Sequence, residues 1–248
     1  MTVTTTGLTK AAGVAAAAAG AMFIGVQIGH PQLNLTTITS TDVLIRDCFK
    51  VLMAPLAVAG FTGMYLSQVR RNGVLGLVGY LVLSTGFLLI MCTTFFAAFV
   101  APTLAGSNPG FVKDAIALAT SQGSVTGDVG ALAPLWQVQS LCFLVGGVLF
   151  GIALFRAGVL ARWATALLAF GGFVSIALSF TSDAFYRFLA YPTAIALIGL
   201  GVSLWMSQRT VSPVETSSVE TSSVETGSVE TGASPAPVPS HDDAPAVR

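Results

Sequence analysis

The stretch VLGLVGYLVLSTGFLLIMCTTFFAAFVA, residues 74–101, contains no charged side chain. An α-helix rises about 1.5 Å per residue, so roughly 20 apolar residues cross the ~30 Å hydrocarbon core of a bilayer. This stretch exceeds that requirement. It therefore predicts a membrane-spanning α-helix.

Further long, uncharged or nearly uncharged runs lie on both sides of it. They predict an all-α fold, a polytopic transmembrane helix bundle within residues 9–209. A short polar N-terminal segment, residues 1–8, precedes the bundle. The six helices are expected at about 11–29, 46–69, 74–101, 132–155, 163–182 and 186–208.

The composition supports a fold in lipid and excludes one class of partner. Hydrophobic residues make up 54% of the 248 residues and charged residues 9%, whereas soluble domains carry about 25% charged residues. The formal net charge is zero, and nucleic-acid binding needs clustered Lys and Arg. We expect membrane lipids as partners and no nucleic acid.

The N-terminus allows two interpretations. Lys10 followed by an Ala-rich run resembles a signal peptide. However, the uncharged run continues to His30, which is long enough to span a bilayer. We therefore favour a retained first helix.

The distribution of Lys and Arg predicts the orientation. With six spans, the short connections after the second and fourth helices lie on the same side as both termini, and they carry four of the arginines. Basic residues in short connections favour the cytoplasmic side. Both termini are therefore expected to be cytoplasmic, in a bacterial cytoplasmic membrane. The residues on this side are Lys10, Arg70, Arg71, Arg156, Arg162 and Arg209, and those on the other are Arg46, Lys50, Lys113 and Arg187.

Two segments outside the runs have their own character. Residues 102–130 are expected to form a long outer loop, in which 110–120 can form an interfacial helix with Phe111, Ile116 and Leu118 against the headgroups. Residues 210–248 contain VETSS-type repeats and few large apolar groups, so they predict a disordered cytoplasmic tail. We expect the repeats to have arisen by drift of a repeated DNA pentad and to have no function. The alternative is a functional tail that is phosphorylated on Ser or Thr.

Small residues indicate how the helices pack. Close approach through Gly and Ala drives helix association in lipid. Gly147 and Gly151 form such a pair in the fourth helix. A weak similarity between 63–87 and 151–173 suggests a repeated hairpin. A longer stripe in the first helix is expected to pack within the monomer, with a homo-oligomer contact as the alternative; it comprises Gly13, Ala17, Ala21, Gly25 and Gly29.

Polar residues gather at the outer ends of four predicted helices, and ionisable groups within a membrane are costly enough to suggest a function. Anchoring in the headgroups explains the same pattern, with Arg46 neutralising Asp47 and Arg187 pairing with Asp183. The alternative is an outward-facing, anion-tolerant site in which Lys50 lies deepest. The candidate ligand-binding residues are Lys50, Arg46, Asp47, Arg187, His30 and Gln137.

The sequence gives little support for an enzymatic activity. Only His30 and His241 are available, which argues against a two-histidine haem site and a Ser–His protease. No Walker-type phosphate loop and no metal-ligand spacing occur in the sequence. We therefore expect no catalysis, no cofactor and no metal. Cys48, Cys92 and Cys142 are interpreted as small helix residues.

The Gly29-His30-Pro31 helix end, Gly63-Met-Tyr-Leu66 and the segment 151–160 resemble a family of small multi-helix membrane proteins of actinobacteria. The resemblance covers roughly residues 8–208 and implies a membrane topology without catalytic residues. The first functional hypothesis is non-catalytic binding of a lipid or a partner protein at the outer polar rim. The second is a small transporter or facilitator for an apolar or anionic solute, and the third is a membrane enzyme acting through the long outer loop.

Overall fold

A computed structural model of the chain describes residues 3–120, 123–177 and 190–208. These residues form helices and no strand, as the apolar runs predict. The predicted tail, residues 210–248, and Arg187 lie outside them. The long helices are α1 (Thr5–Gln27), α2 (Thr41–Leu66), α3 (Val69–Phe95), α6 (Leu132–Ala157), α7 (Arg162–Ala177) and α9 (Tyr191–Ser207).

Among the described residues, three helices are long and apolar enough to cross a membrane. They are α1, α6 and the helical run Val69–Ser107, whose backbone is kinked at Gly73. The last comprises α3, the π-helical turn η2 (Phe96–Val100) and α4 (Ala101–Ser107). The helices α7 and α9 are apolar but shorter. Each of the six predicted segments thus contains a helix, while three of these helices meet the length and composition of a span.

Two helices begin earlier than predicted because capping residues precede them. The Thr4 hydroxyl accepts the Gly7 N–H at 3.1 Å and starts α1. Ser40 caps α2 by accepting the Val43 N–H at 3.4 Å. Such side chains satisfy backbone donors that have no partner inside the helix. Residues 5–8, predicted to lie in the polar segment before the bundle, therefore belong to α1.

The predicted outer loop at 102–130 is largely helical. The helix α5 (Pro109–Thr120) confirms the helix expected at 110–120. However, Phe111 and Ile116 pack against a small cluster formed by Ile38, Ala101 and Val112. The short helix η1 (Thr37–Thr39) supplies Ile38. Phe111 and Ile116 are thus partly buried against the chain itself, and their contact with headgroups stays a prediction, as does that of Leu118.

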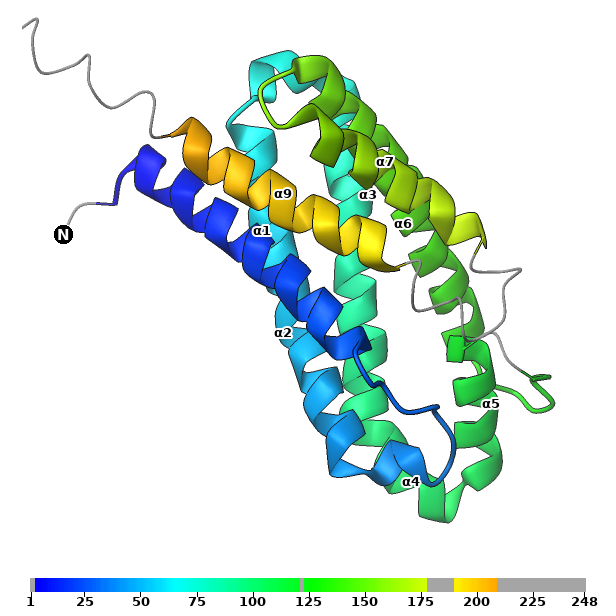
Figure 1. Cartoon of the computed structure of the whole chain (residues 1–248). Coiled ribbons are helices and arrows are strands. Elements are labelled where there is room, and N and C mark those ends of the chain that lie inside the picture. Colours follow the sequence, from blue (N-terminus) through cyan, green and yellow to red (C-terminus); the bar gives the residue numbers. More distant parts are fainter. Residues whose placement is uncertain (1–2, 121–122, 178–189, 209–248) are drawn as a thin grey trace, which may run out of the picture. The chain divides into compact units, whose positions relative to one another are not determined.

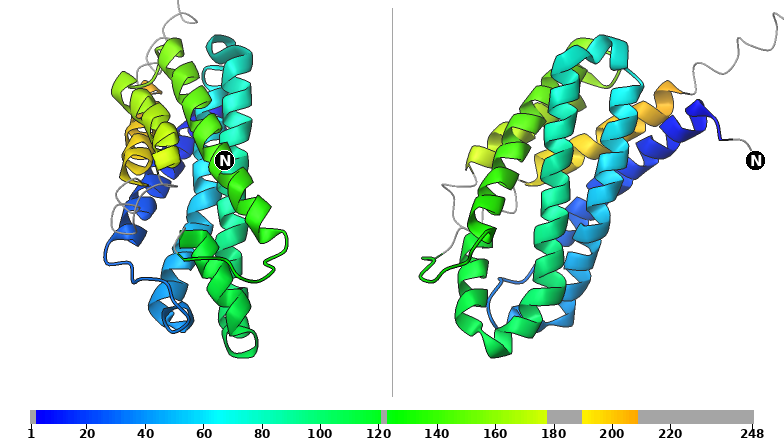
Figure 2. Two further views of the ribbon diagram at one scale, coloured as in Figure 1. Left: turned by 90° about the vertical axis from the view of Figure 1, so that its right-hand side faces the viewer. Right: turned by 180° about the vertical axis from the view of Figure 1, so that it is seen from behind.

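Neighbouring helices run antiparallel. Figure 1 and both views in Figure 2 show α2, α3 and α6 side by side, while α1 and α9 lie together and cross them obliquely. The α2–α3 and α6–α7 connections lie at the same end as the start of α1 and the end of α9 (Figure 1). The opposite end contains the start of α2, the end of α3 and the start of α6.

The contact between α1 and α9 depends on small residues. A Cβ atom added to Gly13 would lie 2.7 Å from the Gly201 carbonyl oxygen. The first part of the predicted stripe, Gly13 and Ala17, thus packs within the monomer. Ala21, Gly25 and Gly29 are exposed, and the buried face continues through Gly20. The prediction is wrong for the second half of the stripe, because buried positions follow the 3.6-residue period instead of a strict interval of four.

Aromatic rings fill the core between α2, α3 and α6. Phe61 lies edge-on to Phe87 and Phe150, with ring centroids 5.2 and 5.9 Å apart. All three side chains are fully buried. Many large apolar side chains instead point outward, among them Leu81, Leu88, Phe95, Leu141 and Ile152.

Pro55 and Pro192 were expected to kink their helices, and they differ in position. Pro55 lies inside α2, whereas Pro192 lies in the first turn of α9, where its missing N–H is tolerated. Gly73 and Gly158, which correspond in the proposed hairpin repeat, both have positive φ, 55° and 68°. The repeat itself stays a prediction.

Candidate ligand-binding cavity

A cavity of about 260 Å³ lies where α1 ends and α2 begins. Its walls also include the end of α3, the turn η2, the end of α5 and the start of α6. Hydrocarbon side chains, including Phe23, Met53 and Phe143, form part of the wall. Its polar lining includes His30, Asp47, Lys50, Thr93, Trp136 and Gln139.

An ion pair lines one side of the cavity. The Lys50 ammonium lies 2.8 Å from Asp47 Oδ1, and the two residues are three positions apart on α2. Residues at this spacing share a helix face, as the sequence indicates. Asp47 is 4% exposed. A carboxylate so buried needs a cationic partner, and Lys50 supplies it.

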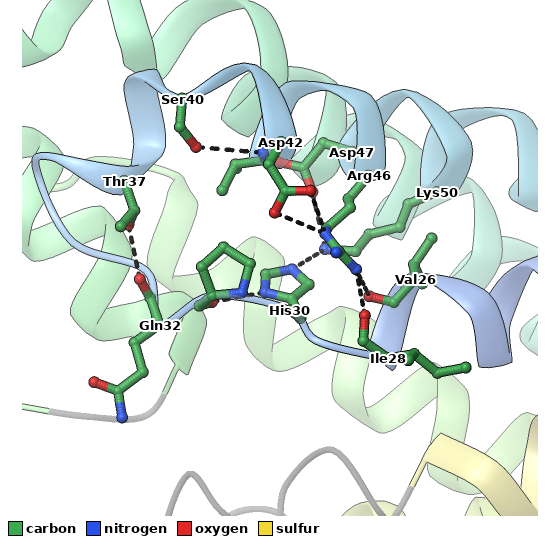
Figure 3. A network of polar contacts seen from close by, with 12 residues as sticks. Val26, Ile28, His30, Gln32, Thr37, Ser40, Asp42, Arg46, Asp47 and Lys50 are labelled. Atoms are coloured by element: carbon green, nitrogen blue, oxygen red, sulfur yellow. Dashed lines mark hydrogen bonds and ion pairs between the residues drawn. The ribbon is translucent and has the colours of Figure 1, made fainter.

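His30 extends this pair toward the end of α1. Its Nε2 lies 3.2 Å from Lys50 Nζ, and its Nδ1 lies 2.8 Å from the Pro31 carbonyl oxygen (Figure 3). A carbonyl oxygen only accepts, so Nδ1 carries the proton. The ammonium only donates, so Nε2 accepts. These contacts assign a neutral imidazole with its proton on Nδ1.

Arg46 has a different role from the one predicted. Its Nε donates to both carboxylate oxygens of Asp42, at 3.0 and 3.1 Å. Its Nη1 donates to the carbonyls of Val26 and Ile28, at 3.2 and 2.7 Å (Figure 3). These are carbonyls at the end of α1, which the helix leaves without internal partners. Arg46 therefore joins α1 to α2 and neither neutralises Asp47 nor lines the cavity.

The α3 and α6 walls meet through a buried hydrogen bond. The Thr93 hydroxyl donates to Gln139 Oε1 at 3.0 Å. Gln139 is 9% exposed, and Thr93 and Thr94 are also buried. The π-helical turn η2 follows directly and contributes Ala97 to the cavity. Single π turns within helices frequently occur at functional sites.

The predicted site residues divide into three groups. The structure brings His30, Asp47 and Lys50 together, and it directs Arg46 to α1. Gln137 is exposed and lies outside the cavity lining. Arg187 lies outside the described residues, so its role as a ligand contact stays a prediction, as does its pairing with Asp183.

Sequence reasoning placed Trp136 and Gln139 at the outer end of α6 but selected only Gln137 as a ligand contact, and it missed Ser140 and Phe143. Trp136, Gln139, Ser140 and Phe143 all line the cavity. Their spacing of three and four residues places them on one helix face, which does not include Gln137. That periodicity is the signal that could have identified Gln139. Thr93 and Thr94 carried no comparable signal inside a long apolar run.

A carboxylate of α5 holds the loop that follows this helix. Asp114 accepts the backbone N–H groups of Thr126 and Gly127, at 3.1 and 2.7 Å. Hydrogen bonds to the ionised form stabilise it, first that from Thr126 and then that from Gly127, and they lower the pKa of Asp114 below its ordinary value. The loop after α5 is therefore attached to the helix that contributes Ala119 and Thr120 to the cavity.

The fold and the cavity together define an all-helical protein with helices of membrane-spanning length and a pocket that has both polar and apolar walls. Comparisons with protein-family models, with curated proteins and with solved structures find no match to this chain. The resemblance to actinobacterial membrane proteins therefore stays a prediction. The functional argument depends on the cavity.

Proposed function

We propose that this chain is a six-span integral membrane protein that binds a small amphipathic molecule, without catalysis, in the cavity beside Asp47 and Lys50. The cavity carries this proposal. It combines a buried ion pair with hydrocarbon walls, and such a mixture suits a ligand with one polar and one apolar part. The membrane lipids expected from the sequence, or molecules dissolved in them, are the natural source of such ligands.

Placement in a membrane is supported by the outward-facing side chains. Soluble monomers rarely expose large continuous apolar surfaces. Here Leu81, Leu88 and Phe95 on α3 and Leu141 and Ile152 on α6 are 40–56% exposed. Lipid would cover them at little cost. The short helices α7 and α9 would then cross the bilayer within the bundle, beside the three longer helices.

The distribution of charge supports cytoplasmic termini. Basic residues lie near the start of α1 and beside the two short connections: Lys10, Arg70, Arg71, Arg156 and Arg162. Figure 1 shows these helix ends at one end of the bundle. Basic residues in such connections favour the cytoplasmic side of a bacterial membrane. The cavity would then lie in the outer leaflet.

Filling the cavity tests the proposal. Ala97 lines the cavity, so Ala97→Leu should displace the ligand without disturbing the ion pair. Native mass spectrometry of protein extracted in its own lipids should show one small bound molecule on the wild-type chain and none on Ala97→Leu. The matched control is Ala21→Leu, at an exposed position of α1, which should retain the molecule. An equal ligand content in all three proteins, or none in any, contradicts the proposal.

A transporter or facilitator is the second candidate function. It is favoured by Gly73, at a kink near the start of α3, and Gly158, at the end of α6, which both have positive φ and correspond in the proposed hairpin repeat. Hairpin repeats are common in transporters. Proteoliposomes containing the wild-type protein should then swell faster in acetate than those containing Ala97→Leu. Equal swelling rates, matching those of empty liposomes, exclude this function for that solute.

A further inference from the structure

The charge of the cavity restricts what it can bind. Within the described part of the chain, its ionisable lining residues are Asp47, Lys50 and His30. Asp47 and Lys50 cancel at 2.8 Å, and the contacts of His30 assign a neutral ring. Arg46, the nearby cation, is directed to Asp42 and to the end of α1. The lining contributed by the described residues is therefore electrically balanced.

A balanced site disfavours charged ligands. If the protein is embedded in lipid, the cavity lies in a medium of low dielectric constant. An anion bound there would leave one uncompensated negative charge, and a cation one positive charge. Each costs several kcal/mol after relaxation. An uncharged ligand avoids this cost, in contrast to the anion-tolerant pocket expected from the sequence.

The unused hydrogen-bonding groups indicate the chemistry of the ligand. Lys50 has three N–H donors, of which Asp47 and His30 use two. Gln139 uses its oxygen to accept from Thr93. Its amide N–H groups make no hydrogen bond with the described residues, although the side chain is nine-tenths buried. Two residues that line the cavity, Lys50 on α2 and Gln139 on α6, thus have N–H donors available to an acceptor oxygen.

The volume sets the size. A cavity of about 260 Å³ has the volume of roughly nine water molecules at 30 Å³ each. It lies just below the range of about 300–1,000 Å³ for typical ligand pockets. This volume suits a single short chain or one ring and is too small to enclose the headgroup and both chains of a phospholipid. Phe23, Met53 and Phe143 provide its apolar contacts.

We infer that the ligand is a small, uncharged amphiphile whose carbonyl oxygen accepts hydrogen bonds from Lys50 and Gln139. This inference rests on the proposed function, because it names the chemical class of the molecule that the cavity binds. A carbonyl group offers two lone pairs, so it can serve donors from both walls. Its hydrocarbon part lies against the apolar side chains.

The test uses four probes with ten-carbon chains: decanamide, decanoate, decylammonium and decane. Trp136 lines the cavity, so its fluorescence reports binding in a Trp163→Phe/Trp205→Phe protein reconstituted in nanodiscs at pH 8. Binding at the site is the saturable signal that Ala97→Leu abolishes. Decanamide should bind at least about tenfold more tightly than either charged probe, because about 1.4 kcal/mol corresponds to a factor of ten. Decane, which has no acceptor, should also bind more weakly.

A single charge change should invert the selectivity. Asp47→Asn leaves Lys50 uncompensated, so decanoate should then bind more tightly than decanamide. Asp42→Asn is the matched control, because Asp42 is exposed and pairs with Arg46 outside the cavity; it should keep the preference for decanamide. The wild-type comparison does not depend on the folding of either variant.

The outcomes separate the two proposals. If decanoate or decylammonium binds wild-type protein as tightly as decanamide, or if Asp47→Asn keeps the wild-type order, the assigned ligand class is wrong while binding in the cavity stands. If no probe gives a saturable signal that Ala97→Leu abolishes, both the ligand class and the proposed function are wrong.

Discussion

The Arg46 guanidinium donates to the Ile28 carbonyl oxygen at 2.7 Å and thereby connects the start of α2 to the end of α1. The same side chain contacts Val26 and Asp42. It therefore fixes the helix ends that position His30 beside Lys50. Its role is structural, although its charge and location suggest a ligand contact.

Replacing Arg46 by Ala should lower the free energy of unfolding by about 1–3 kcal/mol, because carbonyls of α1 lose a charged donor. SDS titration of the protein in mixed micelles would measure this loss. Asp42→Asn removes the exposed ion pair but leaves the carbonyl contacts, so it should cost less than about 1 kcal/mol. Equal effects of the two variants would show that the ion pair, and not the connection to α1, is important.

The α1–α9 contact predicts that replacing a glycine of α1 by Ala destabilises the protein at position 13 but not at position 25. A Cβ on Gly13 would lie 2.7 Å from the Gly201 oxygen and 3.0 Å from the Trp205 nitrogen. Gly13→Ala should therefore destabilise the protein by about 1–3 kcal/mol through overpacking. A Cβ on Gly25 would meet no atom within 4 Å, so Gly25→Ala should be neutral or stabilising by up to about 1 kcal/mol. Thermal unfolding in detergent compares them, and equal melting temperatures would contradict this packing.

The Asp114 contacts predict a pH dependence of stability. The pKa of Asp114 is lowered in the folded protein, so its contribution is fully present above the unfolded value of about 3.9 and is lost as the pH falls further. The difference in melting temperature between wild type and Asp114→Asn should be constant from neutral pH to about pH 5 and shrink below pH 4. Thr126→Val keeps both backbone donors and should retain the pH dependence. A difference that does not change with pH would contradict this role.

The proposed orientation predicts which cysteines react from outside the cell. In a protein with Cys48, Cys92 and Cys142 replaced by Ser, a cysteine at Ser124 should react with a membrane-impermeant maleimide in intact cells. A cysteine at Arg71, near the α2–α3 connection, should react only after permeabilisation. The reverse pattern would invert the topology, and reaction at both positions would contradict it.

The sequence predicted the helices well and their ends less well. Apolar runs located α1, α2, α3, α6, α7 and α9, because burial in lipid demands long uncharged segments. Helix ends depend on local hydrogen bonds instead. Ser40 starts α2 before the first predicted residue, and Pro102 lies in the first turn of α4 where a helix end was expected.

The site was predicted only in part, for a related reason. Asp47 and Lys50 share a helix face through their spacing alone, so the sequence could identify them. The selection of Gln139 over Gln137 depends on which face of α6 meets α3, and this is a tertiary property. The orientation of the Arg46 side chain depends on the carbonyls at the end of α1. The sequence of α2 does not reveal these partners.

The balance between Asp47 and Lys50 also constrains how this chain can vary. If only one of the two residues is replaced, the other is left as an uncompensated buried charge. This lowers the free energy of unfolding by about 3–5 kcal/mol. Replacement of both by uncharged residues leaves no such charge. Substitutions at positions 47 and 50 are therefore coupled. During evolution the two residues either change together, through a destabilised single-substitution intermediate, or both stay as they are.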